Sequence, residues 1–229
     1  METRTFGRIA VTLPGVDEPG IYLSNVTSLE GGRGTVQDFH YADADLRELD
    51  LSNAKLLSGR ISGLRAQRTR LHDVRVASVE FGNSDFGPMQ WTDGKLSRAV
   101  FRNCKLMGAA LSGLVLENVL FDNCKLDYAT FNDIRAAGPL IFSQCVLSEA
   151  TFTNCDVSRA VFADCTLRLT EFARGKYQDC DLRGNDLSAV RGVAELRKVI
   201  IDRAQQTQLA EALAAELDVT YGEDLDDRR

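Results

Sequence analysis

The chain has little of several residue types on which common folds and functions depend. Its 229 residues include four prolines, two histidines and one tryptophan, and 27 lysines and arginines face 33 acidic residues. The formal net charge of −6 leaves no basic excess, which argues against a nucleic-acid binder. No apolar run approaches the length of a membrane span, and the N-terminus lacks a charged segment followed by an apolar one. We therefore expect a soluble cytoplasmic protein that contacts neither nucleic acid nor membrane.

Motifs of catalysis and cofactor binding are also missing. The sequence has no G-x-S-x-G turn, no phosphate-binding glycine loop and no C-x-x-C pair. Only His40 and His72 could contribute imidazole to a metal site. Asp73 follows His72, but adjacent residues of one solvated turn do not form a nucleophile and its base. We expect no catalytic residue, no cofactor and no metal, and hence no enzyme.

The sequence does contain a five-residue repeat between Tyr41 and Leu187. The central residue of each repeat is large and apolar, and the residue two places earlier is small or apolar. Centres follow one another in fives from Tyr41 to Ala136, shift by one residue at Pro139, and resume at Phe142. A period of five matches neither the period of about 3.6 of a helix nor that of about 2 of a strand.

This period fits a chain that turns a corner every five residues and closes a square coil in four corners. The central and i−2 side chains then point inward, and the other three positions face water. About seven and a half coils, in layers ~4.8 Å apart, would make a rod roughly 36 Å long. Pro139 suits a one-residue bulge because proline has no N–H to contribute to a ladder.

Stacking every fourth repeat places like residues in columns. One column holds five consecutive phenylalanines, and the six cysteines all fall in the inward i−2 position. We expect these thiols to pack as small apolar groups rather than to form disulfides or a metal site. The alternative, a redox-sensing thiol pair, requires solvent access that this position denies. The phenylalanines are Phe81, Phe101, Phe121, Phe142 and Phe162, and the cysteines are Cys104, Cys124, Cys145, Cys155, Cys165 and Cys180.

Units such as Ala44-Asp45-Leu46-Arg47-Glu48 and Ala54-Lys55-Leu56-Leu57-Ser58 resemble the A(D/N)Lxx motif of the pentapeptide-repeat family. The resemblance covers roughly 150 residues. It implies an all-β fold, a right-handed quadrilateral parallel β-helix, to which the sequence adds a short C-terminal α-helix.

The flanking segments break the repeat. Arg4–Leu13 and Ile21–Leu29 are two extended runs around a turn at residues 14–20, so we expect residues 1–38 to form a hairpin that covers the N-terminal end of the rod. The β-helix is expected over 39–201, a helix over 202–217, capped by Asp202 and Gln205, and a flexible acidic tail over 218–229. Leu209, Leu213 and Leu217 recur every four residues on one face of this helix. They either cap the rod or form a dimer seam, as a C-terminal segment does in the quinolone-resistance members of the family.

The resemblance also suggests a partner, because the activity known in the family is binding to DNA gyrase or topoisomerase IV by an acidic rod that imitates DNA. Such binding inhibits the enzyme or protects it from quinolone-like poisons. Duplex DNA as long as this rod carries about 20 charges, so the whole rod is a poor imitation.

Charge nevertheless differs between the four walls of the rod. The Leu51 wall comprises the outward residues beside Leu51, Leu71, Trp91, Leu111, Phe131, Phe152 and Phe172. The Tyr41 wall, which we expect to adjoin it, comprises the outward residues beside the column from Tyr41 to Leu182. These two walls are acidic and could imitate DNA over part of the rod. The Leu51 wall supplies the candidate binding residues Asp50, Asp73, Asp93, Asp133 and Glu171. The basic wall, beside Leu56 and its column, carries Lys55, Arg75, Lys95, Arg98, Arg135, Arg159 and Lys176. The alternative function is a rigid interaction scaffold with an unrelated partner.

Overall fold

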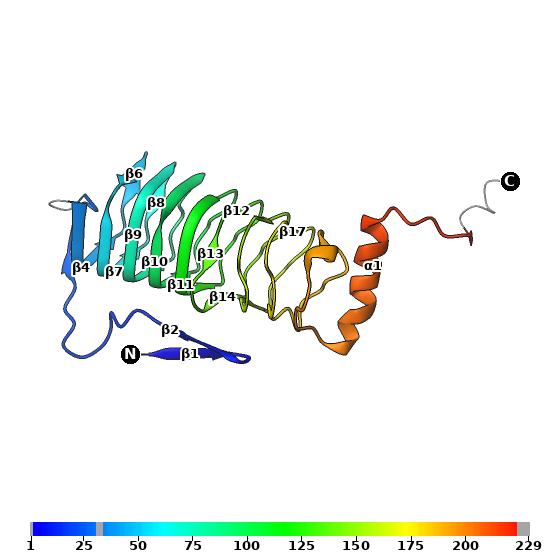
Figure 1. Cartoon of the computed structure of the whole chain (residues 1–229). Helices are drawn as coiled ribbons and strands as arrows, with labels where there is room; N and C mark the ends of the chain where they lie inside the picture. Colours follow the sequence, from blue (N-terminus) through cyan, green and yellow to red (C-terminus); the bar gives the residue numbers. More distant parts are fainter. Residues whose placement is uncertain (1, 31–33, 224–229) are drawn as a thin grey trace.

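Residues twenty positions apart in the sequence lie side by side in the structure. Leu51 pairs with Leu71, Leu71 with Trp91, and Trp91 with Leu111, always in parallel register. Four five-residue sides therefore close one coil, as the repeat predicts. The computed structural model describes residues 2–30 and 34–223, and the stacked coils form one long solenoid (Figure 1).

The offset between coils lengthens by one residue at the position predicted from the phase shift. Leu116 pairs with Ala136, twenty residues on, whereas Val119 pairs with Leu140, twenty-one residues on. The extra residue thus lies between Ala136 and Leu140, next to Pro139. The predicted parallel β-helix with a short C-terminal helix is confirmed.

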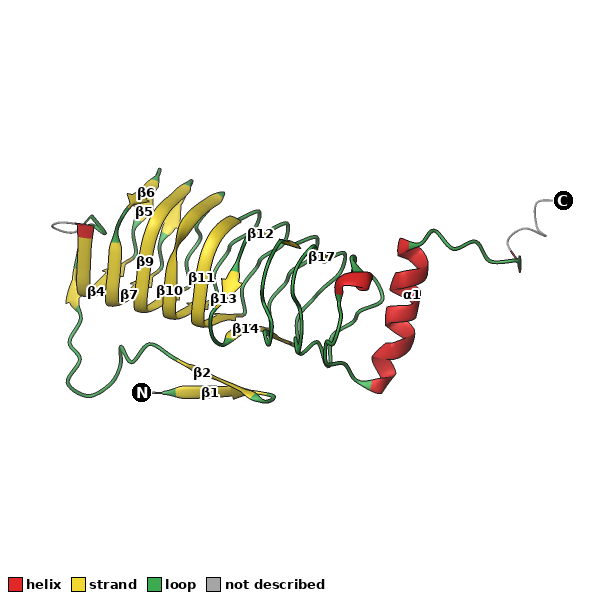
Figure 2. Cartoon of the chain, in the orientation of Figure 1, coloured by secondary structure: helices red, strands yellow, loops and turns green. Residues whose placement is uncertain are grey.

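Long strands in the N-terminal half give way to short strands and turns in the C-terminal half (Figure 2). The elements are β1 (Thr3–Phe6), β2 (Ile9–Thr12), β3 (Ser24–Asn25), β4 (Thr35–Ala42), β5 (Asp45–Leu46), β6 (Leu49–Ser52), β7 (Lys55–Ser62), β8 (Arg65–Ala66), β9 (Thr69–Gly82), β10 (Met89–Arg102), β11 (Ala110–Asp122), β12 (Thr130–Asn132), β13 (Arg135–Ala136), β14 (Leu140–Ser143), β15 (Thr151–Thr153), β16 (Val161–Ala163), β17 (Glu171–Ala173), the 3-10 helices η2 (Val193–Glu195) and η3 (Arg203–Gln205), and α1 (Gln206–Glu216).

The core is built from the central and i−2 side chains, stacked coil on coil. Phe101 lies between Phe81 at 4.4 Å and Phe121 at 4.9 Å, ring centroid to ring centroid, and the rings are nearly parallel. The stack continues through Phe142 and Phe162, with 5.0 Å at each step. All five phenylalanines are buried, so the predicted column exists and forms one inner wall of the rod.

A second phenylalanine stack, which the sequence analysis did not single out, faces the first. Phe152 stacks between Phe131 at 4.4 Å and Phe172 at 5.4 Å. Rings of the two stacks meet edge to face, for example Phe131 and Phe142 at 5.8 Å and 86°. This is a favoured arrangement of aromatic rings.

The N-terminal segment differs from the expectation in both extent and place. Gly7, with a φ of 56°, turns the chain inside the expected first run, so β1 and β2 form a hairpin between residues 3 and 12. This hairpin lies along the side of the solenoid rather than over its end (Figure 1). The second run joins the solenoid: β3 pairs with β4, and Leu29 is buried in the main core.

The C-terminal helix lies across the last coil (Figure 2). Gln205 fixes its start, since its side-chain Nε2 donates to the carbonyls of Leu182 and Asn185 at 2.9 and 2.7 Å, and its Oε1 accepts from Asp202 N at 2.7 Å. Every polar group of this buried amide except one lone pair is thereby engaged. Residues 224–229 of the expected acidic tail lie outside the described residues.

Candidate partner-binding surface

The acidic column of the Leu51 wall follows from the geometry of the corners. Asp73, Asp93 and Asp133 each occupy the i+2 position, where φ is 45°, 58° and 52°. This left-handed conformation disfavours most L-residues but is tolerated by aspartate, asparagine and glycine. The corner conformation therefore favours short polar residues, although longer ones such as Arg98 and Tyr128 also adopt it, and it places the three aspartates on the outside of the rod.

The carboxylates of this column have different spacings along the rod. Asp73 and Asp93 lie on adjacent coils, Gly113 occupies the next coil, and Asp133 follows. A Cβ placed on Gly113 would come within 2.5 Å of Asp93 Oδ1, so the Asp93 carboxylate extends over Gly113. Three layers separate Asp73 from Asp133, roughly 14 Å.

None of the five candidate carboxylates has an ion-pair partner within 4.0 Å among residues 2–30 and 34–223. Asp50, Asp93 and Asp133 are exposed, and Asp73 and Glu171 are partly buried. Asp133 accepts a hydrogen bond from Asn132 Nδ2 at 2.8 Å. Their charge is therefore free to act on a partner.

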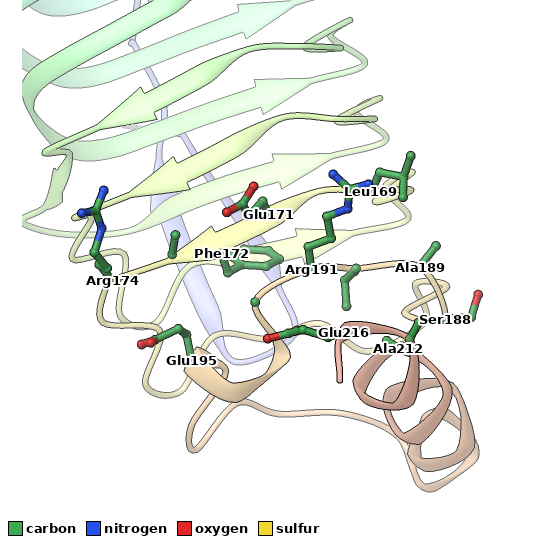
Figure 3. Close-up of a pocket in the computed structure, with 14 residues that line it drawn as sticks. Leu169, Glu171, Phe172, Arg174, Ser188, Ala189, Arg191, Glu195, Ala212 and Glu216 are labelled. Carbon is green, nitrogen blue, oxygen red and sulfur yellow. The ribbon is translucent and has the colours of Figure 1, made fainter. Parts of the chain in front are cut away.

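Glu171 lies at the C-terminal end of the Leu51 wall, in the same outward column as Asp50. It also lines a groove between the last coils and α1, which has a volume of about 670 Å³ and an apolar floor that includes Phe172 and Ala212. Figure 3 shows Glu171 together with Arg174 and Arg191 among the side chains that line this groove. All five candidate carboxylates therefore belong to one wall, and Glu171 stands where that wall borders a mixed-charge groove.

The Tyr41 wall, in contrast, is not a free acidic surface. Four outward positions on it are apolar and are buried under the N-terminal hairpin. Its carboxylates are also neutralised: Asp122 pairs with Arg4 at 2.8 Å, and Glu80 with both Arg60 and Arg102 at 2.9 Å. The expectation that this wall adjoins the Leu51 wall and adds to its acidic surface is wrong. The phenylalanine columns of the two walls face each other across the core, the hairpin covers the Tyr41 wall, and arginines pair with its charges.

Sequence reasoning missed the four apolar residues under the hairpin. They are Val100, Leu120, Ile141 and Val161. Each stands immediately before a phenylalanine of the main stack, at a position that faces outward. The signal that could have found the buried patch is an aliphatic residue at this outward position in four consecutive coils, where a polar residue is usual.

The basic wall is partly neutralised along its length. Lys95 pairs with Glu117 at 2.8 Å and Lys176 with Asp156 at 3.3 Å. Lys55 and Arg75 are register neighbours on consecutive coils, and neither has an ion pair within 4.0 Å in the described part of the chain. Like charges directly opposite one another in a sheet are destabilising, so this pair of cations favours an anionic partner.

The three leucines of the candidate dimer seam have different surroundings. Leu209 packs against the solenoid core, Leu213 is partly buried, and Leu217 is 65% exposed. Ala212, on the same side as Leu209, is buried, and Gln208 Oε1 accepts from Leu187 N at 3.0 Å. α1 therefore caps the end of its own rod. A dimer seam through Leu213 and Leu217 stays a prediction.

The six cysteines are free and buried. Their thiols donate to backbone carbonyls of the preceding coil, as Cys155 Sγ does to Phe131 O at 3.3 Å and Cys180 Sγ to Val157 O at 3.0 Å. Burial raises the pKa of Cys155 to about 11 and that of Cys180 to about 12. No group of three His, Cys, Asp or Glu side chains within the described residues could hold a metal ion.

These thiols should not react with a water-soluble disulfide reagent in the folded protein. Burial denies the reagent access to all six thiols. The raised pKa also keeps Cys155 and Cys180 almost fully protonated at pH 8, and only the thiolate is nucleophilic. We expect no fast-reacting thiol in native protein and six after denaturation, measured by thionitrobenzoate release. A native thiol that reacts within seconds would contradict a purely packing role.

The described chain has no helix long and apolar enough to cross a membrane. None of the curated proteins matches it significantly. Residues 114–191 match the family model described as "Pentapeptide repeat region".

Several solved structures resemble the chain at low sequence identity. A trypsin-treated variant of QnrB1, a plasmid-mediated fluoroquinolone resistance protein, has 17% identity and a TM-score of 0.45, and the match covers 75% of this chain and 98% of QnrB1. HetL, from the cyanobacterium Nostoc sp. strain PCC 7120, is a pentapeptide-repeat protein involved in regulating heterocyst differentiation. It has 16% identity and a TM-score of 0.41, over 72% of this chain and 86% of HetL. Residues 114–191 therefore form a pentapeptide-repeat region, and the same five-residue register and square coils continue through the rest of the solenoid.

Proposed function

We propose that this chain is a non-enzymatic interaction protein that binds a type II topoisomerase, DNA gyrase or topoisomerase IV, as a partial mimic of DNA. The observation that carries the proposal is the unpaired acidic column of the Leu51 wall. Asp73, Asp93 and Asp133 project from the same corner of a rigid rod. Asp73 and Asp93 lie on adjacent coils and one coil separates Asp93 from Asp133, so that they resemble phosphates along a duplex. Binding of this kind either inhibits the enzyme or protects it from fluoroquinolones. Protection from the drug would confer antibiotic resistance.

The mimicry is local. Duplex DNA presents one charge per ~1.7 Å of helix axis, whereas three aspartates extend over roughly 14 Å of this wall. A contact of this size supplies steering and specificity more than affinity, so we expect the remaining binding energy to come from uncharged contacts. The affinity should fall as salt rises, since exposed charges are screened.

A supercoiling assay with purified gyrase, with and without a fluoroquinolone, tests this function. We expect micromolar protein either to reduce supercoiling or to reduce the drug-induced cleavage of DNA. Heat-denatured protein serves as the control for unspecific effects. If gyrase and topoisomerase IV are both unaffected in either format, the proposed function fails.

The second candidate is a rigid scaffold that binds an acidic protein through the basic wall. The unpaired neighbours Lys55 and Arg75 favour it. The two candidates differ in which wall is sensitive to mutation, so substitutions on the acidic and basic walls distinguish them.

Association through α1 is a separate prediction. If Leu213 and Leu217 form an intermolecular seam, Leu213→Lys should convert a dimer into a folded monomer. If α1 only caps its own rod, the same change should leave the mass in solution unchanged and lower stability by about 1 kcal/mol or more. Light scattering together with a melting curve separates these outcomes.

A further inference from the structure

We propose that the Tyr41 wall carries a docking surface for a basic, amphipathic β-hairpin, and that the chain's own N-terminal hairpin is an exchangeable occupant of it. A partner segment of the same chemistry would displace this hairpin. The inference is independent of whether gyrase binds the Leu51 wall.

The surface has an apolar stripe where the solenoid otherwise presents polar groups. Val100, Leu120, Ile141 and Val161 are register neighbours on four consecutive coils. The same outward position holds Arg60 and Glu80 before the stripe and Asp181 after it. Without a cover, the stripe would be a continuous apolar patch on the outside of the rod, which marks an interaction site in a monomeric protein.

The hairpin is complementary to this stripe. Phe6, Val11 and Leu13 form one apolar cluster with the four aliphatic residues, separate from the main core. Thr3, Arg4 and Thr5 of the same hairpin are exposed. The hairpin thus buries one apolar side against the solenoid and leaves its polar side in water.

Charge reinforces the fit at both ends of the stripe. Near one end, Arg4 donates to Asp122 at 2.8 Å. At the other, the hairpin turn lies next to Asp181, since a Cβ on Gly7 would approach Asp181 Oδ2 to 3.0 Å. Hydrogen bonding from Arg183 lowers the pKa of Asp181, and the charge of Arg8 in the turn adds to this effect. The surface therefore recognises an apolar strand pair with cationic side chains.

The hairpin is attached in a way that permits exchange. Its two strands form their own antiparallel sheet, which is not joined to the sheet of the solenoid. Among the described residues no backbone–backbone hydrogen bond links residues 2–13 to the coils; the backbone contact is from Thr12 N to the side chain of Asn118 at 3.0 Å. Release of the hairpin would therefore leave every ladder of the solenoid intact and would cost the contacts of the hairpin alone, which is less than the free energy of global unfolding.

A labelled synthetic peptide with the sequence of residues 2–13 tests the proposal on full-length protein. In the wild type the tethered hairpin competes at millimolar effective concentration, so we expect weak binding. Val11→Asp would place a carboxylate against the stripe and release the tethered hairpin, and we expect it to tighten peptide binding at least tenfold, by fluorescence anisotropy. Adding Ile141→Asp should abolish this binding, whereas adding the matched control Val115→Asp, an outward aliphatic residue on the basic wall, should not.

A measurement on the wild type keeps the proposal falsifiable if Val11→Asp disturbs folding. Native-state hydrogen exchange of the wild type should show the hairpin amides opening while the amides of β9–β11 stay protected. Exchange of the hairpin only by global unfolding would overturn the proposal, as would a folded Val11→Asp variant that does not bind the peptide. A wild-type dimer that Val11→Asp dissolves would make a second copy the occupant and would also overturn it.

Discussion

Phe121→Ala should lower the free energy of unfolding by ~3–5 kcal/mol, the range for truncation of buried aromatic residues. The ring of Phe121 is 3% exposed and is stacked between Phe101 at 4.9 Å and Phe142 at 5.0 Å. Its loss leaves a cavity in the middle of the column and removes two ring contacts. Because coils are stabilised only by their neighbours, the middle of the rod has no other source of stability.

Chemical denaturation monitored by circular dichroism measures this effect, and the fluorescence of Trp91, the one tryptophan, reports on the same core. Tyr128→Ala is the matched control, because this aromatic side chain is 56% exposed. It should change stability by no more than about 0.5 kcal/mol, as surface substitutions do. A denaturation curve that Phe121→Ala leaves unchanged would be incompatible with the stacked core.

The replacement of Asp73, Asp93 and Asp133 together by asparagine should abolish any effect on supercoiling. Asparagine keeps the size of the side chain and tolerates the left-handed conformation of these corners, so the fold should survive. The three charges are lost, and with them the electrostatic part of the contact. We expect no effect of this variant at doses up to about ten times those at which the wild type acts.

Neutralisation of the basic wall provides the matched control for this triple change. In this variant glutamine replaces Lys95, Arg98 and Arg135, which removes the same number of charges from another side of the rod. This variant should act on gyrase like the wild type. If it loses activity while the aspartate variant keeps it, the basic wall is the contact surface and the scaffold function is favoured.

The solenoid could be predicted in detail from the sequence because its determinants are local and periodic. The inward positions, the phenylalanine column and the one-residue shift at Pro139 all follow from the period of five. The corner conformation also follows, since short polar residues and glycine recur at its left-handed position. Each of these features repeats many times, so errors at single positions do not alter the result.

The flanking segments could not be placed in the same way. The hairpin of β1 and β2 has no repeat, and its docking site depends on Val100, Leu120, Ile141 and Val161, which come together only when four coils are stacked. The periodic pattern predicts which residues face inward, but the hairpin packs against residues on the outside of the rod. For the same reason the Tyr41 wall was assigned as acidic, although Arg4 and Arg102 neutralise its Asp122.

That the aspartates of the Leu51 wall point outward could be predicted, because the outward positions of a regular coil follow directly from the sequence period; their role in binding stays a prediction. The groove beside Glu171 could not be predicted, since it is completed by α1. A helix that packs across the end of a rod is placed by tertiary contacts such as those of Gln205, which have no counterpart in the repeat.

Competition between this protein and duplex DNA for gyrase tests the central claim most directly. Labelled duplex is bound to gyrase, the protein is added, and release of the duplex is followed by fluorescence anisotropy at several salt concentrations. A DNA mimic should displace the duplex, with an affinity that falls as salt rises, and the Asp73, Asp93 and Asp133 variant should not. Simultaneous binding of duplex and protein, or equal displacement by the variant, would contradict the claim that the Leu51 wall takes the place of DNA.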